Sequence, residues 1–366
     1  MIRSCVQPNV RVMSQKIRIK DIAVKAGVSV GTVDRVLHHR PNVSKEALEK
    51  VRKVLKEINY QPNMYASALA LNRSYTFCLM MPRHASDAYW DEIEQGVMKA
   101  CESRRDFLVD IKVIYYQRMH DETFVKACAK CLAGKPDGVI IVPAETEVTR
   151  RFTDKLHEQT IPFVLLDSYL PELNPLSFYG QDSLNSGYFA AKMLMLIAAR
   201  ESEIMLMKMT HEGRVSSRQQ ENRETGFKRY MNEHFPKVKF VELELPLDGR
   251  KEQFNRLLEQ FFAEYPQVRH GITFCSKAHL VGEYLLANKL THFRMMGYDS
   301  VPQNVECLRE GSISFLVVQH AFMQGLYSFE ALFRSIVLKR QVKPVNYMPI
   351  ELLCKENVDF YQKTLI

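Results

Sequence analysis

Residues 18–38, RIKDIAVKAGVSVGTVDRVLH, hold two short helical patterns separated by a glycine. The apolar residues of the first pattern fall on one helical face and are Ile19, Ile22, Ala23 and Ala26. Gly27 supplies a tight turn, and Ser29 is a natural N-cap for a second helix that runs to Leu37. The stretch therefore predicts a helix, a turn and a second helix.

A third amphipathic helix is predicted over residues 44–58, SKEALEKVRKVLKEI. Ser44 is its N-cap, and its apolar stripe consists of Ala47, Leu48, Val51, Val54, Leu55 and Ile58. Three helices in such a short span are typical of a compact DNA-binding unit. We assign residues 16–61 to an all-α helix-turn-helix headpiece.

The segments on either side of this headpiece are interpreted as connectors. Pro62 breaks the preceding helix and Asn63 can cap a short new one, so residues 62–74 predict a hinge helix or linker. Residues 1–15 are predicted to be a disordered extension, and Met13 offers a second possible start of translation.

From Tyr75 onward, short apolar runs such as TFCLMM, GVIIVPA and SFLVVQ alternate with amphipathic helical patterns. This alternation, with near-continuous apolar strands, indicates parallel sheets covered by helices. A single sheet over about 290 residues would be large for one domain. We therefore expect residues 75–366 to form an α/β domain of two lobes.

The formal net charge of +8 is concentrated near the N-terminus. Residues 16–73 carry twelve Lys and Arg against five Asp and Glu, whereas residues 74–366 are nearly neutral. This asymmetry is expected of a nucleic-acid-binding module attached to a neutral body. No apolar run approaches the ~20 residues of a membrane helix, and the first residues lack the apolar core of a signal peptide. We expect a cytoplasmic protein with no membrane association.

The sequence gives no sign of a metal site, a cofactor or catalysis. Cys128 and Cys131 form a C-x-x-C within a predicted helix, without a second Cys or His pair at zinc spacing. The chain lacks G-x-G-x-x-G, a phosphate-binding loop, G-x-S-x-G and H-E-x-x-H, and its histidines do not cluster in sequence. We therefore do not expect an enzyme.

Residues 17–73 resemble the headpiece and hinge of the lactose-repressor (LacI-type) family of bacterial transcriptional regulators. The features that match, in order, are IKDIA, AGVS, TV-x-RVL, a Val-Ser pair before the third helix, and NYQPN…A…LA. Residues 75–366 resemble the periplasmic sugar-binding-protein fold of such regulators, through YWDEIEQGV, IIVPAE, NRETGF, GYD and VVQHAFMQG. The resemblance implies two lobes crossed by three strands, with a ligand bound between them at the carboxyl ends of parallel strands.

The resemblance also implies a function. Family members are regulators, commonly repressors, that bind pseudo-palindromic double-stranded DNA operators as homodimers under the control of a small-molecule effector. We expect a dimer, because the chain ends without the leucine heptad of family tetramers. We expect a sugar or sugar derivative as effector, and whether it releases or strengthens DNA binding stays open. The alternative is a sugar-binding protein of transport type, against which the headpiece argues.

Family correspondence places the second helix in the major groove of DNA. Val30 and Gly31 become the main reading positions, and Arg35 could donate two hydrogen bonds to a guanine. Ser29 and Thr32 are placed for phosphate contacts.

Asp34 departs from the family, which usually has a small hydroxyl residue at this position. It could accept from a lysine or from cytosine N4, or face solvent paired with a nearby lysine. In the hinge, Asn63 and Ala66 match the start of the family's helix, and Leu69 stands where a leucine wedges into the minor groove. The alternative is a linker helix with Leu69 packed on its own lobe.

Sugars are bound by aromatic faces and by polar groups that pair with hydroxyls. The resemblance places Tyr89 and Trp90 as stacking aromatics and implies polar contacts from Glu145, Arg223, Ser276, Asp299 and Gln319. Arg218 is a weaker candidate, because its spacing to the following glycine departs from the family. As alternatives, Trp90 could be a core aromatic and Asp299 a helix cap.

Ser276-Lys277 replaces the Asn-Asp that the family commonly has. A lysine with Arg223 nearby would make the pocket cationic, which favours an acidic effector such as a sugar acid or phosphate. The alternative is that Lys277 faces solvent.

Overall fold

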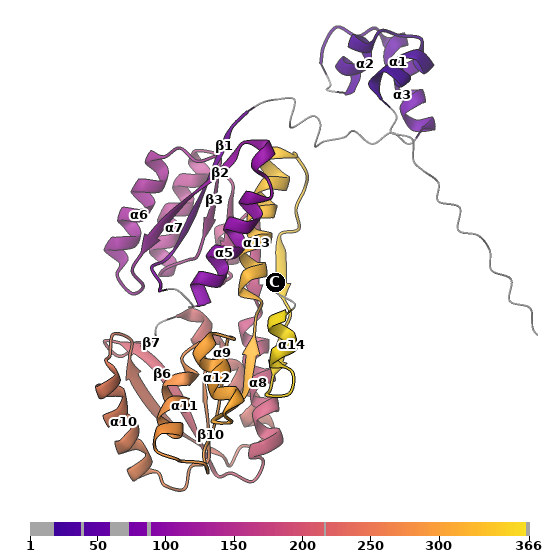
Figure 1. Cartoon of the computed structure of the whole chain (residues 1–366). Helices are drawn as coiled ribbons and strands as arrows, with labels where there is room; N and C mark the ends of the chain where they lie inside the picture. Colours follow the sequence, from indigo (N-terminus) through magenta and orange to yellow (C-terminus); the bar gives the residue numbers. More distant parts are fainter. Residues whose placement is uncertain (1–17, 38–39, 59–72, 86–88, 216, 364–366) are drawn as a thin grey trace, which may run out of the picture. The chain divides into compact units, whose positions relative to one another are not determined.

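The computed structural model describes residues 18–37, 40–58, 73–85, 89–215 and 217–363. The chain divides into two compact units between Leu71 and Asn72 (Figure 1). We call the described residues 18–58 the headpiece and the described residues 73–363 the two-lobed domain.

The headpiece contains the three predicted helices, α1 (Ile19–Ala26), α2 (Val30–Leu37) and α3 (Lys45–Glu57). Gly27 ends α1 with a φ of 65°, a conformation that costs glycine little. Ser29 accepts a hydrogen bond from the Thr32 N–H at 3.1 Å, and Ser44 caps α3. The three helices enclose a core of Ile22, Ala23, Ala26, Val33, Val36, Val51 and Val54.

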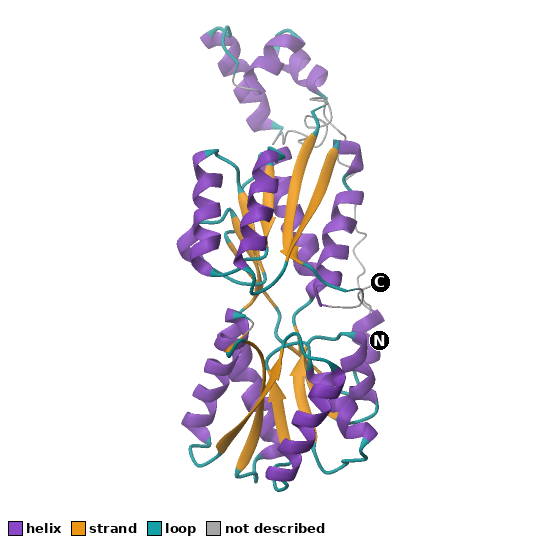
Figure 2. Ribbon diagram, turned by 90° about the vertical axis from the view of Figure 1, so that its left-hand side faces the viewer, coloured by secondary structure: helices purple, strands orange, loops and turns teal. Residues whose placement is uncertain are grey.

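The first lobe is built on a six-stranded sheet with the order β12-β5-β4-β3-β1-β2, in which every pair is parallel. Its strands are β1 (Tyr75–Pro82), β2 (Val109–Tyr116), β3 (Gly138–Ile141), β4 (Phe163–Leu166), β5 (Ser177–Gln181) and β12 (Val345–Met348). Helices cover both faces, which explains why β3 and β4 are buried along their whole length (Figure 2). On one face lie α6 (Asp121–Ala133) and α7 (Thr146–Glu158). On the other lie α5 (Tyr89–Glu102) and α13 (Ala321–Leu332).

The second lobe has a seven-stranded sheet with the order β13-β11-β10-β9-β6-β7, and β8 also pairs with β6. Its strands are β6 (Glu203–His211), β7 (Arg214–Val215), β8 (Lys239–Pro246), β9 (His270–Thr273), β10 (Arg294–Tyr298), β11 (Ile313–Val318) and β13 (Glu351–Leu353). Only the short strands β7 and β13 run antiparallel among these described strands. The helices are α8 (Ser183–Ala198), α9 (Arg218–His234), α10 (Lys251–Glu264), α11 (Ala278–Ala287), α12 (Pro302–Arg309) and α14 (Val358–Lys363).

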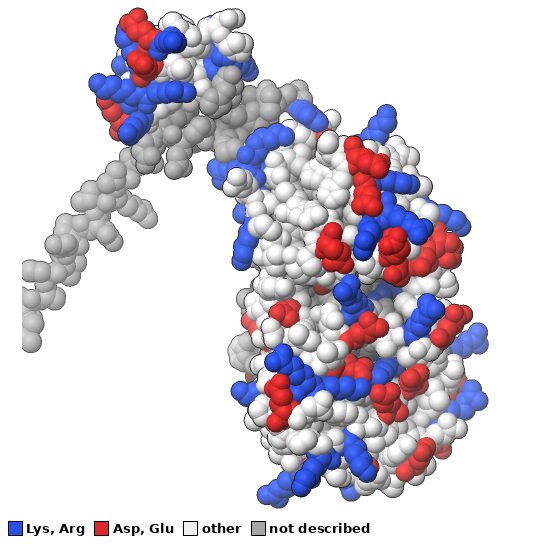
Figure 3. All heavy atoms as spheres, turned by 180° about the vertical axis from the view of Figure 1, so that it is seen from behind, with Lys and Arg blue, Asp and Glu red and all other residues white. Residues whose placement is uncertain are grey.

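Three short helical turns complete the description: η1 (Arg105–Phe107), η2 (Pro171–Leu173) and the π-turn η3 (Phe333–Val337) after α13. The two-lobed α/β architecture and the parallel sheets predicted from the sequence are thus confirmed. Both signs of charge are interspersed over the face of the two-lobed domain that Figure 3 shows. None of the helices in the described part of the chain is long and apolar enough to cross a membrane.

The chain passes between the lobes three times: from β5 to α8, from β11 to α13, and from β12 to β13. The buried side chain of Gln181 joins the three crossings. Its Nε2 donates to the carbonyl oxygens of Val318 at 3.0 Å and Pro349 at 2.9 Å, and its Oε1 accepts from the Ser186 hydroxyl at 2.6 Å. One side chain therefore links the three crossings by hydrogen bonds.

Candidate DNA-binding helix and interlobe cleft

Helix α2 has one face committed to the headpiece core and one face left to solvent. Val33 and Val36 point into the core, whereas Val30, Gly31 and Arg35 are exposed. The other predicted DNA contacts of the headpiece, Ser29 and Thr32, have their hydroxyl oxygens 2.9 Å apart beside the first turn of α2. The residues predicted to read DNA therefore occupy the face that packing does not use.

Asp34 on the same helix forms an ion pair. Its Oδ2 lies 3.2 Å from Nη1 of Arg40, and both side chains are partly exposed. The sequence analysis expected a lysine as partner, whereas the ion pair described here is with an arginine. The nearby guanidinium offsets the carboxylate charge on a helix that is expected to approach phosphates.

The hinge residues Asn63, Ala66 and Leu69 lie outside the described residues. Their role as a minor-groove wedge stays a prediction.

A cavity of about 720 Å³ lies between the two lobes. This is within the range of 300–1,000 Å³ that is typical of small-molecule sites. Its first-lobe wall follows the carboxyl ends of β1 to β4. Its second-lobe wall lies before and at the start of α9 and consists of Gly213, Arg214, Val215, Ser217, Arg218 and Glu221. The position agrees with the rule that open α/β sheets bind ligands beyond the carboxyl ends of their strands.

Two of the seven main effector candidates, Trp90 and Glu145, line this cavity, as does the weaker candidate Arg218. Trp90 is half-buried at its wall, with the Arg118 guanidinium 5.6 Å from its ring centroid and the Tyr89 ring edge-on at 4.9 Å. Glu145 begins α7, where its carboxylate accepts from two backbone N–H groups at 2.8 and 3.1 Å. The carboxylate of Glu145 therefore caps a helix at the cavity wall.

Tyr89, Asp299 and Gln319 instead border a much smaller space of about 10 Å³, which is at the limit for one water molecule. Tyr89 donates its hydroxyl hydrogen to Asp167 at 2.8 Å. Gln319 donates to Asp299 at 2.8 Å and accepts from Arg223 at 3.0 Å. These side chains form a buried polar network rather than an open wall.

Arg223 is almost fully buried in the same network. Its Nη1 donates to the Phe274 carbonyl at 2.9 Å, and its guanidinium stacks over the Tyr298 ring at 4.1 Å. Within the described structure its Nε has no hydrogen-bond partner. α8 and α9 pack closely at this arginine because Gly187 of α8 has no side chain. A Cβ atom at Gly187 would clash with the Arg223 carbonyl.

Ser276 lies apart from both spaces, and its carbonyl accepts from Asn304 at 3.2 Å. Lys277 is exposed at the start of α11 and also lies outside both spaces. Its position matches the alternative in which this lysine faces solvent. Lys277 therefore does not contribute a positive charge to the cavity, contrary to the expectation from the sequence.

Two buried aspartates follow equivalent strand ends in the two lobes. Asp167 comes directly after β4 and Asp299 directly after β10, and each has a φ near 70°. Burial raises the pKa of both carboxyls, that of Asp299 to about 6, while the Arg223 guanidinium opposes the rise. Asp299 does not cap the next helix, because Val301 holds the N-cap position of α12. The sequence analysis missed Asp167, although FVLLD places a carboxylate at a strand end just as GYD does.

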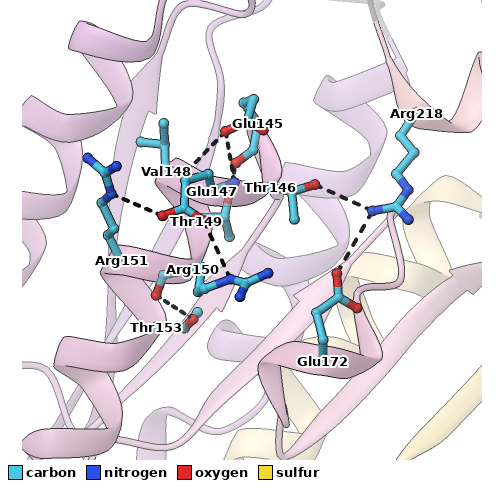
Figure 4. Close-up of polar contacts among 10 residues, drawn as sticks. All are labelled: Glu145, Thr146, Glu147, Val148, Thr149, Arg150, Arg151, Thr153, Glu172 and Arg218. Atoms are coloured by element: carbon cyan, nitrogen blue, oxygen red, sulfur yellow. Dashed lines mark hydrogen bonds and ion pairs between the residues drawn. The ribbon is translucent and has the colours of Figure 1, made fainter.

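The start of α9 makes the contacts that join the lobes beside the cavity. Gln219 donates to the Asp167 carbonyl. Figure 4 shows the Arg218 guanidinium between Thr146 at the start of α7, at 3.4 Å, and Glu172 in η2, at 3.9 Å. No three His, Cys, Asp or Glu side chains gather into a possible metal site within the described residues.

Comparisons with known proteins agree with this architecture. The model of the bacterial regulatory proteins of the lacI family matches residues 18–63, and the model of the periplasmic binding protein domain matches residues 77–339. The chain belongs to the lacI family of bacterial regulatory proteins. This LacI-family regulator is 40% identical to a Bacteroides fragilis protein described as a LacI transcriptional regulator, whose crystal structure matches with a TM-score of 0.77 over 79% of this chain and 100% of that one.

Curated relatives are similar over part of their length. The HTH-type transcriptional regulator DegA of Bacillus subtilis is 26% identical over 249 residues, which are 67% of this chain and 70% of DegA. MalR of Streptococcus pneumoniae is 27% identical over 180 residues, which are 48% of this chain and about half (52%) of MalR. The glucose-galactose binding protein GanP of Geobacillus stearothermophilus, at 19% identity and a TM-score of 0.68 over 78% of this chain and 99% of GanP, shows the shared fold. The curated relatives are regulators, not enzymes, and the headpiece match favours a regulator over a transport protein.

Proposed function

We propose that this LacI-family regulator is a repressor whose affinity for a DNA operator is set by a carbohydrate-derived effector. The observation that carries the proposal is the 720 Å³ cavity between the lobes, in a chain that also has a lacI headpiece. The protein acts in the cytoplasm as a homodimer on a pseudo-palindrome, without catalysis, metal or cofactor.

DNA is read by the exposed face of α2. Arg35 donates to a guanine, Val30 touches a thymine methyl group, and Gly31 allows the backbone to approach closely. Ser29 and Thr32 bind phosphates and so fix the register of the helix on DNA. In the hinge, Asn63, Ala66 and Leu69 enter the minor groove.

The effector occupies the interlobe cavity, with Trp90 and Glu145 at its wall. Tyr89, Arg223, Asp299 and Gln319 form a buried polar network that meets the cavity at Asp167, which accepts from the Tyr89 hydroxyl. A sugar hydroxyl enters this network, and reaches Ser276, when the lobes shift. A ligand changes DNA binding only if it favours one arrangement of the lobes over another. The contacts of Arg218 and Gln219 differ between such arrangements because they span both lobes.

The test is a selection of bound fragments from random DNA with the full-length protein. The Arg35→Ala variant serves as the probe, and Arg229→Ala, which replaces an exposed arginine of α9, serves as the control. We expect the wild-type and control proteins to enrich the same pseudo-palindrome and the Arg35 variant to lose its preference at one base pair in each half-site. Failure of the wild-type protein to enrich any sequence at moderate salt, both alone and with the candidate sugars added, would refute the proposal.

A further inference from the structure

We propose that the effector is an anion, a sugar acid or a phosphorylated sugar, whose acid group binds Arg218 of the second lobe together with Arg118 of the first. This inference rests on the proposed function, since it names the chemical class of ligand for the same cavity. Its basis is the set of charged side chains that line the cavity, and Lys277 plays no part in it.

Three arginines line the cavity, and they come from both lobes. Arg118 follows β2 in the first lobe, Arg214 lies in β7, and Arg218 is the first residue of α9. A guanidinium has five N–H donors in a planar fork that fits a carboxylate or a phosphate with two parallel hydrogen bonds. A sugar that carried an acid group would therefore meet matching donors on both sides of the cavity.

The contacts that Arg218 makes are longer than those of a strong ion pair. Its Nη1 lies 3.9 Å from the Glu172 carboxylate and 3.4 Å from the Thr146 hydroxyl, whereas charge-assisted N–H···O bonds measure about 2.7–2.9 Å. About half of its side chain is exposed, at 53%. An acid group in the cavity can thus offer this guanidinium a shorter and better oriented partner than it has in this structure (Figure 4).

The carboxylates that line the same cavity do not cancel this preference. Glu145 is engaged by the backbone N–H groups at the start of α7, and Asp167 accepts from the Tyr89 hydroxyl. Burial raises the pKa of Asp167, which lowers the cost of keeping it protonated beside an anion. Asp121 and Glu221 are exposed, as Arg214 and Arg218 are, so water screens these four charges alike and the short-range hydrogen bonds of the guanidinium decide.

Arg118 lies against Trp90, so the anion site and the aromatic wall adjoin. The Arg118 guanidinium is 5.6 Å from the Trp90 ring centroid. A ligand with a pyranose face and an acid group can therefore contact the indole and the guanidinium together. Because Arg218 already bridges the lobes, a ligand that takes over its contacts also alters the interlobe interface.

The experiment measures binding of matched pairs to the full-length protein by calorimetry and by thermal shift. The pairs are D-glucuronate with D-glucose, D-galacturonate with D-galactose, and glucose 6-phosphate with glucose. We expect at least one acidic member to bind about tenfold or more tightly than its neutral parent, with an affinity that falls as salt rises. Arg218→Gln should weaken that binding about 10- to 100-fold. Arg229→Gln, outside the cavity, should leave it unchanged.

Any of three results would overturn the inference. They are neutral sugars that bind as well as their acids, acidic members that all fail to bind, and an Arg218→Gln variant that binds the acids normally. Operator binding, measured in parallel, separates the two proposals. If the protein binds an operator but responds only to a neutral sugar, the proposed function stands and the anionic class fails. If acids bind through Arg218 while no operator is bound, the proposed function fails and the ligand class stands.

Discussion

Replacing Gln181 with leucine would remove the side chain that joins the three crossings between the lobes. The change deletes three hydrogen bonds, to the carbonyls of Val318 and Pro349 and from the Ser186 hydroxyl. Gln181 is 3% exposed, so water does not readily replace these partners. At about 1 kcal/mol net for each bond, the expected loss in the free energy of unfolding is about 3 kcal/mol.

The assay is urea unfolding of the full-length protein, supported by calorimetry. For a domain of this size, a loss of about 3 kcal/mol corresponds to a fall in Tm of roughly 6–12 °C. Gln95→Leu is the control, because Gln95 is exposed on α5 and bonds only a neighbouring carboxylate among the contacts described. A Gln181→Leu protein that unfolds within about 0.5 kcal/mol of the control would refute the role of Gln181 in the hinge.

Three further predictions concern the buried carboxyl of Asp299, the DNA contact of Arg35 and the packing of α8 against α9. Burial raises the pKa of Asp299 to about 6, from an ordinary value of 3.8, so the folded protein holds this proton more tightly than the unfolded chain. The stability that protonation of Asp299 gives is full below about pH 4 and is lost as the pH rises through 6. Asp299→Asn should therefore flatten the dependence of the free energy of unfolding on pH, measured with urea, and should be more stable than the wild type at pH 8. An unchanged pH dependence would count against this role of Asp299. Arg35→Ala should weaken binding to the selected operator about 10- to 100-fold in fluorescence anisotropy, with little change on random DNA; equal losses on both would mean a phosphate contact only. Gly226→Ala should destabilise the protein by about 1–3 kcal/mol, because the new Cβ would clash with the Leu184 carbonyl where α8 meets α9, and wild-type stability would disprove this close packing.

The headpiece could be predicted almost residue by residue because its signals are local. Gly27, Ser29 and Ser44 mark helix ends through contacts within a few residues, and the predicted third helix at 44–58 is observed as Lys45–Glu57 with its cap at Ser44.

Short strands were harder to predict. β12 and β13 each lie at a sheet edge, have four residues or fewer, and mix polar with apolar side chains, so no apolar run marks them. β5, with the sequence SFYGQ, was also missed because its apolar content is low. Their pairing depends on the chain crossing between the lobes three times, which no local pattern encodes.

The candidate site could be predicted only in part, because the two walls of the cavity come together through the tertiary fold. Trp90 and Glu145 follow strand-to-helix turns and were placed by family correspondence. Arg218 was a weaker candidate from the family resemblance, whereas Arg118 was missed, because only the facing lobes bring it to the cavity. The positive φ of Asp167 and Asp299 is equally invisible in the sequence.

Trp90 allows the most direct test of the central claim, that a small molecule between the lobes controls DNA binding. It is the single tryptophan of the chain and lines the interlobe cavity, so its fluorescence reports on that cavity. A titration of the acidic and neutral sugars would follow Trp90 emission and the anisotropy of a labelled operator in one sample. The account predicts a compound that changes both signals with the same midpoint. A compound that alters operator binding while Trp90 emission stays constant, or that saturates the Trp90 signal while operator binding stays constant, would contradict it.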